Sequence, residues 1–367
     1  MRPFLPADNV KIIYRKDLIE VKDLKLLFRK MRNQLAGNFH GTTRDERLAE
    51  QLIFLLFCKL KDELDRKPHE PVLFQLTYPE KNTVTERIFE LFNQLKNQYK
   101  YIFSDEDRII ADKNSLELMV KEIEKYEITK ASRDVIGDAF EAFLGPSLRG
   151  NKGQFFTPKN VVRAMIKILN PRLGERFIDP ACGTGGFLVV GLAHHTKDDE
   201  TSVERQSVSY DSFYGIDKDC FLAKIAQLYL AILGIEREVI YCENSLDFPE
   251  KWSSEAYEAI QLNSFDVVCT NPPFGAKIPI ESETILENYH FGYKWKQSNG
   301  VWRETKIRQD KQPPQILFIE RCLNLLKKGG RLGIILPDGI FGNPSDRYIM
   351  QFLLQQTKLI ALISCSH

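Results

Sequence analysis

The sequence predicts an α/β protein in which a doubly wound, mostly parallel sheet follows an all-helical N-terminal domain. Two observations support this prediction. From about residue 148, short apolar runs of strand length alternate with helical segments, which is the pattern of a parallel sheet covered on both faces. Residues 1–147 instead carry apolar side chains at helical spacing. We therefore expect a helical domain at 1–147 and an α/β domain at 148–367.

The helical domain is built from amphipathic segments with clear ends. We predict helices over 23–36, 44–64, 84–99, 114–125 and 132–144, the last of them closed by Gly145-Pro146. The second segment is apolar on broad faces and should be mostly buried. Such a domain suits either a structural cap on the α/β domain or a contact with DNA or a partner, and the residues alone leave both alternatives open.

Six apolar runs predict the strands of the α/β domain: ERFID, SFYGID, EVIYC, FDVVCT, GRLGIIL and KLIALIS. Ligands of such sheets bind outside the carboxyl ends of the strands. The unusual polar residues of the domain fall at those ends, namely Asp179, Asp217, Asn244, Asn271 and Asp338. We therefore place the functional site at this edge of the sheet.

The stretch from Gly153 to Gly186 is the most informative in the chain. Thr157 is predicted as a helix N-cap with Pro158 in the first helical position, and Asn170-Pro171 ends that helix. A strand follows, and then the glycine-rich turn DPACGTGG, which allows a ligand to approach the backbone closely. The turn lacks the GxxxxGK[ST] phosphate loop, which argues against a nucleotide triphosphatase, and it also lacks a complete GxGxxG dinucleotide-binding fingerprint.

Three motifs occur in a fixed order: GQFFTP, DPACGTGG and, after the strand FDVVCT, NPPF. With a helical segment in front, they resemble the modification (M) subunits of type I restriction-modification systems, over nearly the whole chain. These are S-adenosylmethionine-dependent DNA methyltransferases that modify the N6 amine of adenine. The resemblance implies a Rossmann-like methyltransferase fold and catalytic domain, S-adenosyl-L-methionine as cofactor, and double-stranded DNA as substrate. It also implies a cytoplasmic complex of two M subunits with one specificity (S) subunit, which an endonuclease (R) subunit can join.

The cofactor needs polar groups for its amino acid part, an acceptor for its ribose and a slot for its adenine. Asp217 ends the second strand, where a carboxylate can accept the ribose hydroxyls. The alternative role, as N-cap of the next helix, suits Asp219 better. Asn244 stands where the family usually has an aspartate near the adenine; its amide can still meet that ring. By resemblance, the remaining cofactor-binding residues are Gln154, Phe155, Phe156, Thr157, Pro158, Asp179, Ala181, Gly183, Thr184, Gly185 and Ser245.

The NPPF turn is the predicted catalytic site. An aromatic amine is a poor nucleophile, and two acceptors aimed at its hydrogens would hold it toward the methyl group. The side-chain oxygen of Asn271 and the carbonyl of Pro272 can accept these hydrogen bonds, while Pro272 and Pro273 fix the backbone. Phe274 can stack on the base. No strong general base is needed, so the rate comes from positioning, and the base must leave the duplex to reach the site.

Composition limits the alternatives. The 51 basic and 50 acidic residues give a net charge of +1, so a local patch or a partner must supply much of the contact with DNA. Seven cysteines without a CxxC motif indicate reduced thiols, and no apolar run is long enough to span a membrane. We expect no metal site, because the adjacent His194 and His195 would diverge on a helix.

The long connection at 275–312 contains the segment YKWKQSNGVWRETK, and its Asn299-Gly300 predicts a hairpin. Basic and aromatic side chains are mixed in it. They indicate either a solvated hairpin with its aromatic residues packed beneath or, as we favour, a DNA-contacting loop beside the NPPF turn.

Two alternatives to a DNA methyltransferase remain. Enzymes that methylate protein glutamines or RNA amines share the Asn-Pro-Pro-aromatic turn, and a non-catalytic subunit would bind DNA or partners only. The chain stops at LIALISCSH, where the family usually continues into a seventh strand and a helical tail. We therefore expect a chain truncated at its C-terminus, with an exposed sheet edge and weak or no activity on its own.

Overall fold

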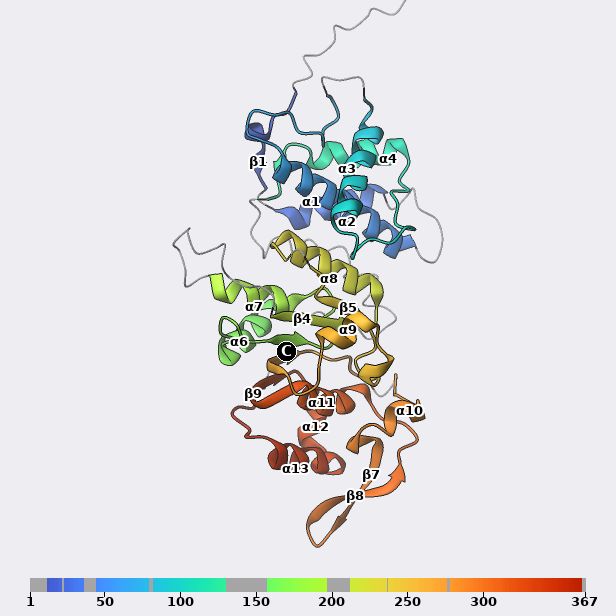
Figure 1. Cartoon of the computed structure of the whole chain (residues 1–367), viewed down its shortest axis with the longest axis vertical. Coiled ribbons are helices and arrows are strands. Elements are labelled where there is room, and N and C mark those ends of the chain that lie inside the picture. The colour runs from blue at the N-terminus through green and yellow to red at the C-terminus, as the bar shows by residue number, and fades with distance from the viewer. Residues whose placement is uncertain are drawn as a thin grey trace, which may run out of the picture. The chain divides into compact units, whose positions relative to one another are not determined.

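The computed structural model describes residues 12–21, 23–35, 44–78, 82–129, 157–196, 212–235, 237–275 and 278–364. The chain divides into two compact units, Met1–Gly150 and Asn151–His367, whose helices and strands are labelled in Figure 1. The boundary predicted at residue 147 falls in a stretch outside the described residues, as does the helix predicted over 132–144.

The first unit is mainly helical, and four of its predicted helices are present. Its elements are η1 (Arg15–Asp17), β1 (Ile19–Glu20), α1 (Leu24–Leu35), α2 (Arg44–Asp65), α3 (Val84–Gln98), α4 (Lys113–Ile123) and β2 (Tyr126–Glu127). The parallel pair of β1 and β2 was not predicted, so this unit is not purely helical. As predicted, α2 is the central helix: its residues from Gln51 to Leu60 are all buried.

Buried charged residues of α2 contact the segments next to β1 and β2. Glu63 is fully buried, accepts hydrogen bonds from the backbone N–H groups of Ile128 and Thr129, and forms an ion pair with Lys59 at 3.2 Å. Arg15 donates to the Glu63 carbonyl and pairs with Glu127. These contacts attach the strand pair to α2. Removing one partner would destabilise the unit, because it would leave a buried charge uncompensated.

The second unit contains a five-stranded sheet in the order β5-β4-β3-β6-β9, and all neighbouring strands are parallel. The strands are β3 (Phe177–Asp179), β4 (Phe213–Asp217), β5 (Ile240–Cys242), β6 (Phe265–Thr270) and β9 (Leu326–Ile334). They correspond to five of the six predicted runs, which confirms the predicted α/β class. Because the strands are parallel, their carboxyl ends share one edge.

Helices cover both faces of the sheet, as in a doubly wound fold (Figure 1). Phe177 and Phe213 stack at 5.1 Å and lie on the face of α7, next to Gly191. Ile178 and Tyr214, the next residue of each strand, belong to the core on the other face with α9 and α11. The helices of this sheet are α6 (Lys159–Leu169), α7 (Gly186–Thr196), α8 (Cys220–Ile232), α9 (Ser254–Ala259) and α11 (Pro314–Leu325).

A second apolar core lies beyond β6 in the chain. It joins the β7–β8 hairpin, α11 and α13, with Phe291 fully buried at its centre. The elements of this region are α10 (Glu283–Leu286), η4 (His290–Gly292), β7 (Tyr293–Ser298), β8 (Val301–Arg308), α12 (Gly339–Gly342), η5 (Pro344–Asp346) and α13 (Arg347–Gln356), whereas η3 (Pro249–Lys251) precedes α9. The hairpin is confirmed: Asn299 and Gly300 both have positive φ, 51° and 78°, as its tight turn requires.

The predicted sixth strand, KLIALIS, is wrong. Residues 358–364 are described and form no strand, and Ile360 and Leu362 are 76% and 60% exposed. An apolar run becomes a strand only where a neighbouring strand accepts its hydrogen bonds, and β9 makes no such pairing with this segment.

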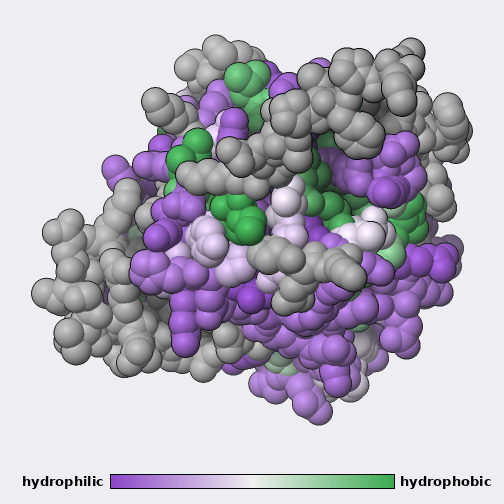
Figure 2. Space-filling view, turned by 90° about the horizontal axis from the view of Figure 1, so that it is seen from above, coloured by the Kyte–Doolittle hydropathy of each residue, from purple (hydrophilic) through white to green (hydrophobic). Residues whose placement is uncertain are grey.

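None of the described helices is long and apolar enough to cross a membrane. Figure 2 shows one face of the molecule, on which hydrophilic residues cover much of the described surface and hydrophobic residues lie in patches between them.

Candidate active site at the carboxyl ends of the strands

The glycine-rich turn follows β3 directly and is held by backbone contacts. Asp179 accepts a hydrogen bond from Ala181 N at 3.0 Å, and Cys182 N donates to the Ile216 carbonyl at 2.9 Å. Gly183 and Gly185 have φ of 53° and 86°, a conformation that favours glycine. The turn therefore has the open backbone that the sequence predicts there.

Asp217 ends β4 and supports the same turn. Its Oδ2 accepts from Gly183 N at 2.8 Å, and its Oδ1 accepts from Asp219 N at 2.9 Å. As predicted, it is Asp219 that caps α8, by accepting from Phe221 N and Leu222 N. An ionised carboxylate can accept about four hydrogen bonds, so Asp217 can still receive hydroxyl groups of a ligand.

Burial changes the acidity of both carboxyls. It raises the pKa of Asp179 to about 7 and also raises the pKa of Asp217, against the hydrogen bonds that stabilise the ionised forms. We call Asp179, Asp217 and the turn between Pro180 and Gly185 the acidic side of the site. It joins carboxylate acceptors to a partly buried glycine-rich backbone, which suits a ligand with hydroxyl and amino groups.

The loop after β5 completes the acidic side. The Asn244 carbonyl accepts from Trp252 Nε1 at 3.0 Å, and Asn244 Oδ1 accepts from Leu246 N at 3.2 Å. This local turn uses the amide oxygen, so the Nδ2 group is the part of Asn244 suited to a ligand. Ser245 is buried and donates to the Pro180 carbonyl, a contact that supports the glycine-rich turn.

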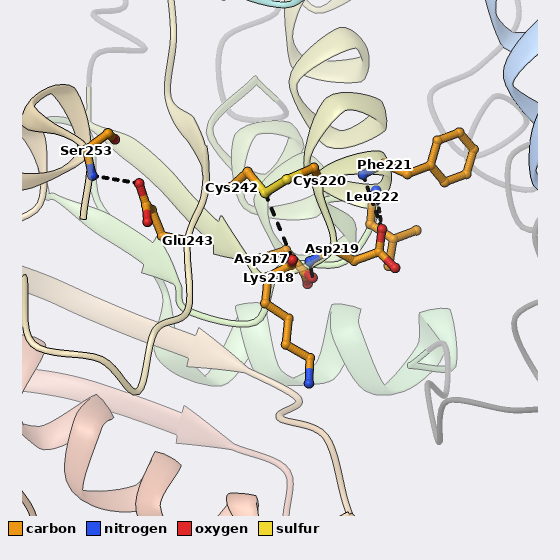
Figure 3. Close-up of a disulfide and its surroundings, with 9 residues drawn as sticks. All are labelled: Asp217, Lys218, Asp219, Cys220, Phe221, Leu222, Cys242, Glu243 and Ser253. Atoms are coloured by element: carbon orange, nitrogen blue, oxygen red, sulfur yellow. Dashed lines mark hydrogen bonds between the residues drawn. A yellow bond between two sulfur atoms is a disulfide. The ribbon is translucent and has the colours of Figure 1, made fainter. Parts of the chain in front are cut away.

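The prediction that the cysteines are reduced thiols is wrong for one pair. Cys220, at the start of α8, forms a disulfide with Cys242, at the end of β5, with Cα atoms 4.9 Å apart. Figure 3 shows this disulfide beside Asp217 and Lys218. Asp217 is the register partner of Cys242, because β4 and β5 are neighbours. Cys58, Cys182, Cys269 and Cys322 are buried free thiols.

The NPPF turn begins where β6 ends. Asn271 Nδ2 donates to Thr157 Oγ1 at 2.9 Å, which joins two of the three motifs across 114 residues of sequence. Pro272 is buried, while Pro273 and Phe274 are partly exposed. We call Thr157-Pro158 and Asn271-Pro272-Pro273-Phe274 the proline side of the site. The prediction that Thr157 is the helix N-cap is wrong. Pro158 holds that position, and α6 begins at Lys159.

Gln315 supports the proline side and was not predicted. It is buried at the start of α11, and its Oε1 accepts from Gly275 N at 3.2 Å. The sequence signal for it is the pair Pro313-Pro314, which marks a helix start and so places the glutamine that follows in the first turn of that helix.

The remaining residues that the sequence analysis singled out lie in different parts of the chain. Gln154, Phe155 and Phe156 lie outside the described residues, and Thr184 is partly exposed in the glycine-rich turn. Asp338 is exposed and begins α12. His194 is within 2.9 Å of Asn170 Oδ1 through its Nε2 atom, and the expectation of no metal site stays a prediction.

The β7–β8 hairpin agrees in part with each of its two predicted roles, which are a solvated hairpin over packed aromatic residues and a DNA-contacting loop. Trp295 stacks on Tyr348 of α13 at 5.6 Å, and Trp302 lies 6.0 Å from the same ring, so these aromatic residues are packed beneath the hairpin. On its other face, Lys296 and Arg303 are exposed and directly opposite each other in the ladder. The hairpin therefore combines aromatic residues that are packed beneath it with basic residues that are exposed.

The fold and the site combine a doubly wound parallel sheet, acidic residues at adjoining strand ends and an Asn-Pro-Pro-Phe turn at the end of the neighbouring strand. The chain belongs to the N-6 DNA Methylase family, whose sequence model matches residues 131–367.

Relatives are found among restriction-modification proteins. The chain is 28% identical over 269 residues to the type I restriction enzyme EcoEI methylase subunit of Escherichia coli, a match that covers 72% of this chain and 49% of that protein. It is 26% identical over 316 residues to the MjaVII methylase subunit of Methanocaldococcus jannaschii, which covers 80% and 48%. The chain thus spans about half the length of these curated relatives.

The fold has solved counterparts. The crystal structure of the type I restriction-modification system methyltransferase subunit from Streptococcus thermophilus matches with a TM-score of 0.57 at 16% identity, over 90% of this chain and 78% of that one. At this identity the match supports the fold alone.

Proposed function

We propose that the chain transfers a methyl group from S-adenosylmethionine to the N6 amine of an adenine in double-stranded DNA. The observation that carries this proposal is the hydrogen bond of Asn271 to Thr157, because it places the NPPF turn next to the start of α6, on the edge of the sheet that bears Asp179 and Asp217. A site with both sides intact favours an enzyme over a non-catalytic subunit.

The acidic side fits the cofactor. When bound, S-adenosylmethionine supplies a methyl group on a positively charged sulfur. Asp217 would accept hydrogen bonds from the ribose hydroxyls with the lone pairs that its two backbone contacts leave. Asp179 and the glycine-rich turn would face the amino acid part, and Asn244 Nδ2 would face the adenine.

The proline side fits the target amine. Asn271 Oδ1 and the Pro272 carbonyl would accept the two amine hydrogens and direct the nitrogen lone pair toward the methyl group. Since Pro272 and Pro273 have no backbone N–H, no donor of theirs competes for these acceptors. Phe274 would stack on the base after it leaves the duplex. The chain's contribution to the rate is then positioning and electrostatics, without a general base.

The hairpin gives the DNA a place to bind. Like charges directly opposite in an antiparallel pair lower stability, and Lys296 faces Arg303 in this way. A phosphate between them would remove that repulsion. The charge reversal Lys296→Glu should weaken DNA binding and reduce the magnitude of the salt slope of log K by about 1. Lys327→Glu is the control, because Lys327 already forms an ion pair with Asp266. An unchanged salt slope for Lys296→Glu would exclude the hairpin from the interface.

We further propose that the chain acts as the modification subunit of a type I complex, with a specificity subunit, a second copy and an endonuclease subunit. The names of its relatives as type I methylase subunits support this role. Recognition by another subunit also explains the near balance of charge in the chain. A cytoplasmic location remains a prediction.

The test is a methylation assay with labelled S-adenosylmethionine and DNA, with and without a specificity subunit. N6-methyladenine, identified by mass spectrometry of the digested DNA, is the expected product, and the Asn271→Ala variant should form it at least about 100-fold more slowly. Label transferred to RNA or to a protein glutamine instead of DNA would select the alternative substrates. Cofactor binding without any transfer, in the presence of the specificity subunit, would select the non-catalytic subunit.

A further inference from the structure

The contact between Thr157 and Asn271 links two turns that are far apart in the chain. Thr157 stands just before α6, and Asn271 just after β6, and the Nδ2–Oγ1 distance is 2.9 Å. Both side chains are partly buried. The bond therefore connects the helix that opens the domain to the turn that carries the catalytic asparagine of the proposed reaction.

Thr157 has no role as a helix cap that would explain its hydroxyl. A threonine before a helix normally accepts from a backbone N–H of the first turn. Here Pro158 is the N-cap of α6, and no side chain caps that end. The hydroxyl accepts from a side chain of another motif instead.

Both partners are held by their backbones. Thr157 precedes Pro158, and Asn271 precedes Pro272, so each residue is restricted to extended conformations. Helix α6, which follows Thr157, also lies close to the sheet: a Cβ on Gly333 of β9 would come within 2.8 Å of Leu169 Cδ1 and 3.0 Å of Met165 Cε. Because little freedom is left in either partner, the hydrogen bond fixes one orientation of the amide at small entropic cost.

The orientation matters because the two ends of an amide are chemically opposite. The nitrogen can only donate and the oxygen can only accept. An amine substrate that presents its hydrogens needs the oxygen. With the nitrogen held by Thr157, the oxygen is the end of the same planar amide group that can face a substrate, whereas a flipped amide would present its hydrogens to the hydrogens of the amine.

We propose that Thr157 is a positioning residue: its hydroxyl holds the amide nitrogen of Asn271, so that the amide oxygen is the atom presented to the target amine. The inference rests on the proposed methyl transfer and deepens it. It assigns to Thr157 an effect on the rate of transfer, in place of the cofactor contact that the sequence predicts.

The kinetic test compares Thr157→Val, which keeps the shape and removes the hydroxyl, with Thr157→Ser, which keeps the hydroxyl. Single-turnover methyl transfer is measured at saturating S-adenosylmethionine and DNA in the complex with a specificity subunit. The valine variant should be about 10- to 100-fold slower, and the serine variant should regain most of the rate. The cofactor Kd from calorimetry should change less than about twofold in both, since the hydroxyl acts through Asn271.

Thr357→Val is the matched control. The Thr357 hydroxyl donates to the Leu353 carbonyl at the end of α13, so this variant loses a similar hydrogen bond outside the site and should keep the wild-type rate. A weaker cofactor Kd for Thr157→Val with an unchanged rate at saturation would overturn the inference in favour of a cofactor contact. Equal rates for Thr157→Val and wild type would overturn it outright.

A second measurement does not depend on activity. In the full chain labelled with ¹⁵N-asparagine, the side-chain amide of Asn271, assigned by the loss of its signals in Asn271→Ala, should exchange its hydrogens faster in Thr157→Val than in wild type. If this change occurs in a chain that methylates nothing, the proposed function fails and the positioning contact stands. If exchange is unchanged, the positioning inference fails whatever the activity.

Discussion

The two sides of the site are fixed in different ways. On the acidic side, Asp217 and Asp179 accept hydrogen bonds from backbone N–H groups, and a disulfide joins the neighbouring elements. On the proline side, a hydrogen bond between the Asn271 and Thr157 side chains holds Asn271 next to prolines that restrict the backbone. The acidic side thus has its shape built into the backbone, while the proline side depends on the orientation of one amide. Changes to the first should alter binding and stability, and changes to the second should alter rate.

The sharpest way to break this comparison is Asn271→Ala. The variant removes one of the two acceptors for the target amine, so methyl transfer should fall by about 10²- to 10³-fold, which corresponds to about 3–4 kcal/mol. Cofactor affinity, measured by calorimetry, should stay within about twofold of wild type. A parallel loss of affinity would mean that the two sides are not separate.

The disulfide should give the next largest effect, on stability alone. Cys220 and Cys242 are 22 residues apart in sequence, and a loop of this size is expected to add about 3 kcal/mol to the free energy of unfolding. Denaturant unfolding with and without a reductant measures this difference. The double variant Cys220→Ser/Cys242→Ser should show no response to the reductant. A response of the same size in that variant would place the redox effect at other cysteines.

Asp217→Asn tests binding on the acidic side. The amide keeps the size of the side chain but loses the charge and one of the two acceptor atoms that Gly183 N and Asp219 N now use. We expect cofactor affinity to fall about 10- to 100-fold, or about 1.5–3 kcal/mol, while the rate at saturating cofactor stays within about threefold. The measurements are calorimetric Kd and single-turnover rate. A loss of rate without a loss of affinity would reverse the assignment of the two sides.

The same contrast explains what could be predicted from the sequence. Five strands were found because parallel strands buried on both faces have apolar runs, but KLIALIS has such a run without a strand neighbour, and composition cannot show that. The motifs showed which residues gather at the strand ends. The bond from Thr157 to Asn271 could not be found, since it depends on how α6 lies against the sheet.

The disulfide was missed for a related reason. Along the chain, Cys220 and Cys242 are far apart and belong to no CxxC or similar motif that would indicate a pair. Their proximity comes from the pairing of β4 with β5, which brings Cys242 opposite Asp217 and close to the start of α8. The signal was present in the predicted topology, because both cysteines stand at or just after the ends of strands.

The smallest effect expected near neutral pH, between pH 6 and 8, is a pH dependence confined to the acidic side. Burial raises the pKa of Asp179 to about 7 in the folded chain, from an ordinary value of 3.8. Between these values the folded chain keeps a proton that the unfolded chain has lost, so this group favours folding at low pH, and the advantage is lost as pH rises through 7. Its share of the free energy of unfolding should fall by about 1.4 kcal/mol between pH 6 and 8.

The Asp179→Asn variant should lack that fall, so the difference between its unfolding curve and that of wild type isolates the group. Thr157 and Asn271 do not titrate, and the proline side should therefore add no pH dependence of its own. The step of methyl transfer at saturating cofactor should then be flatter with pH than cofactor affinity is. A rate at saturation that follows the same pH curve as stability would show that protonation of Asp179 reaches Asn271, and the separation of the two sides would be lost.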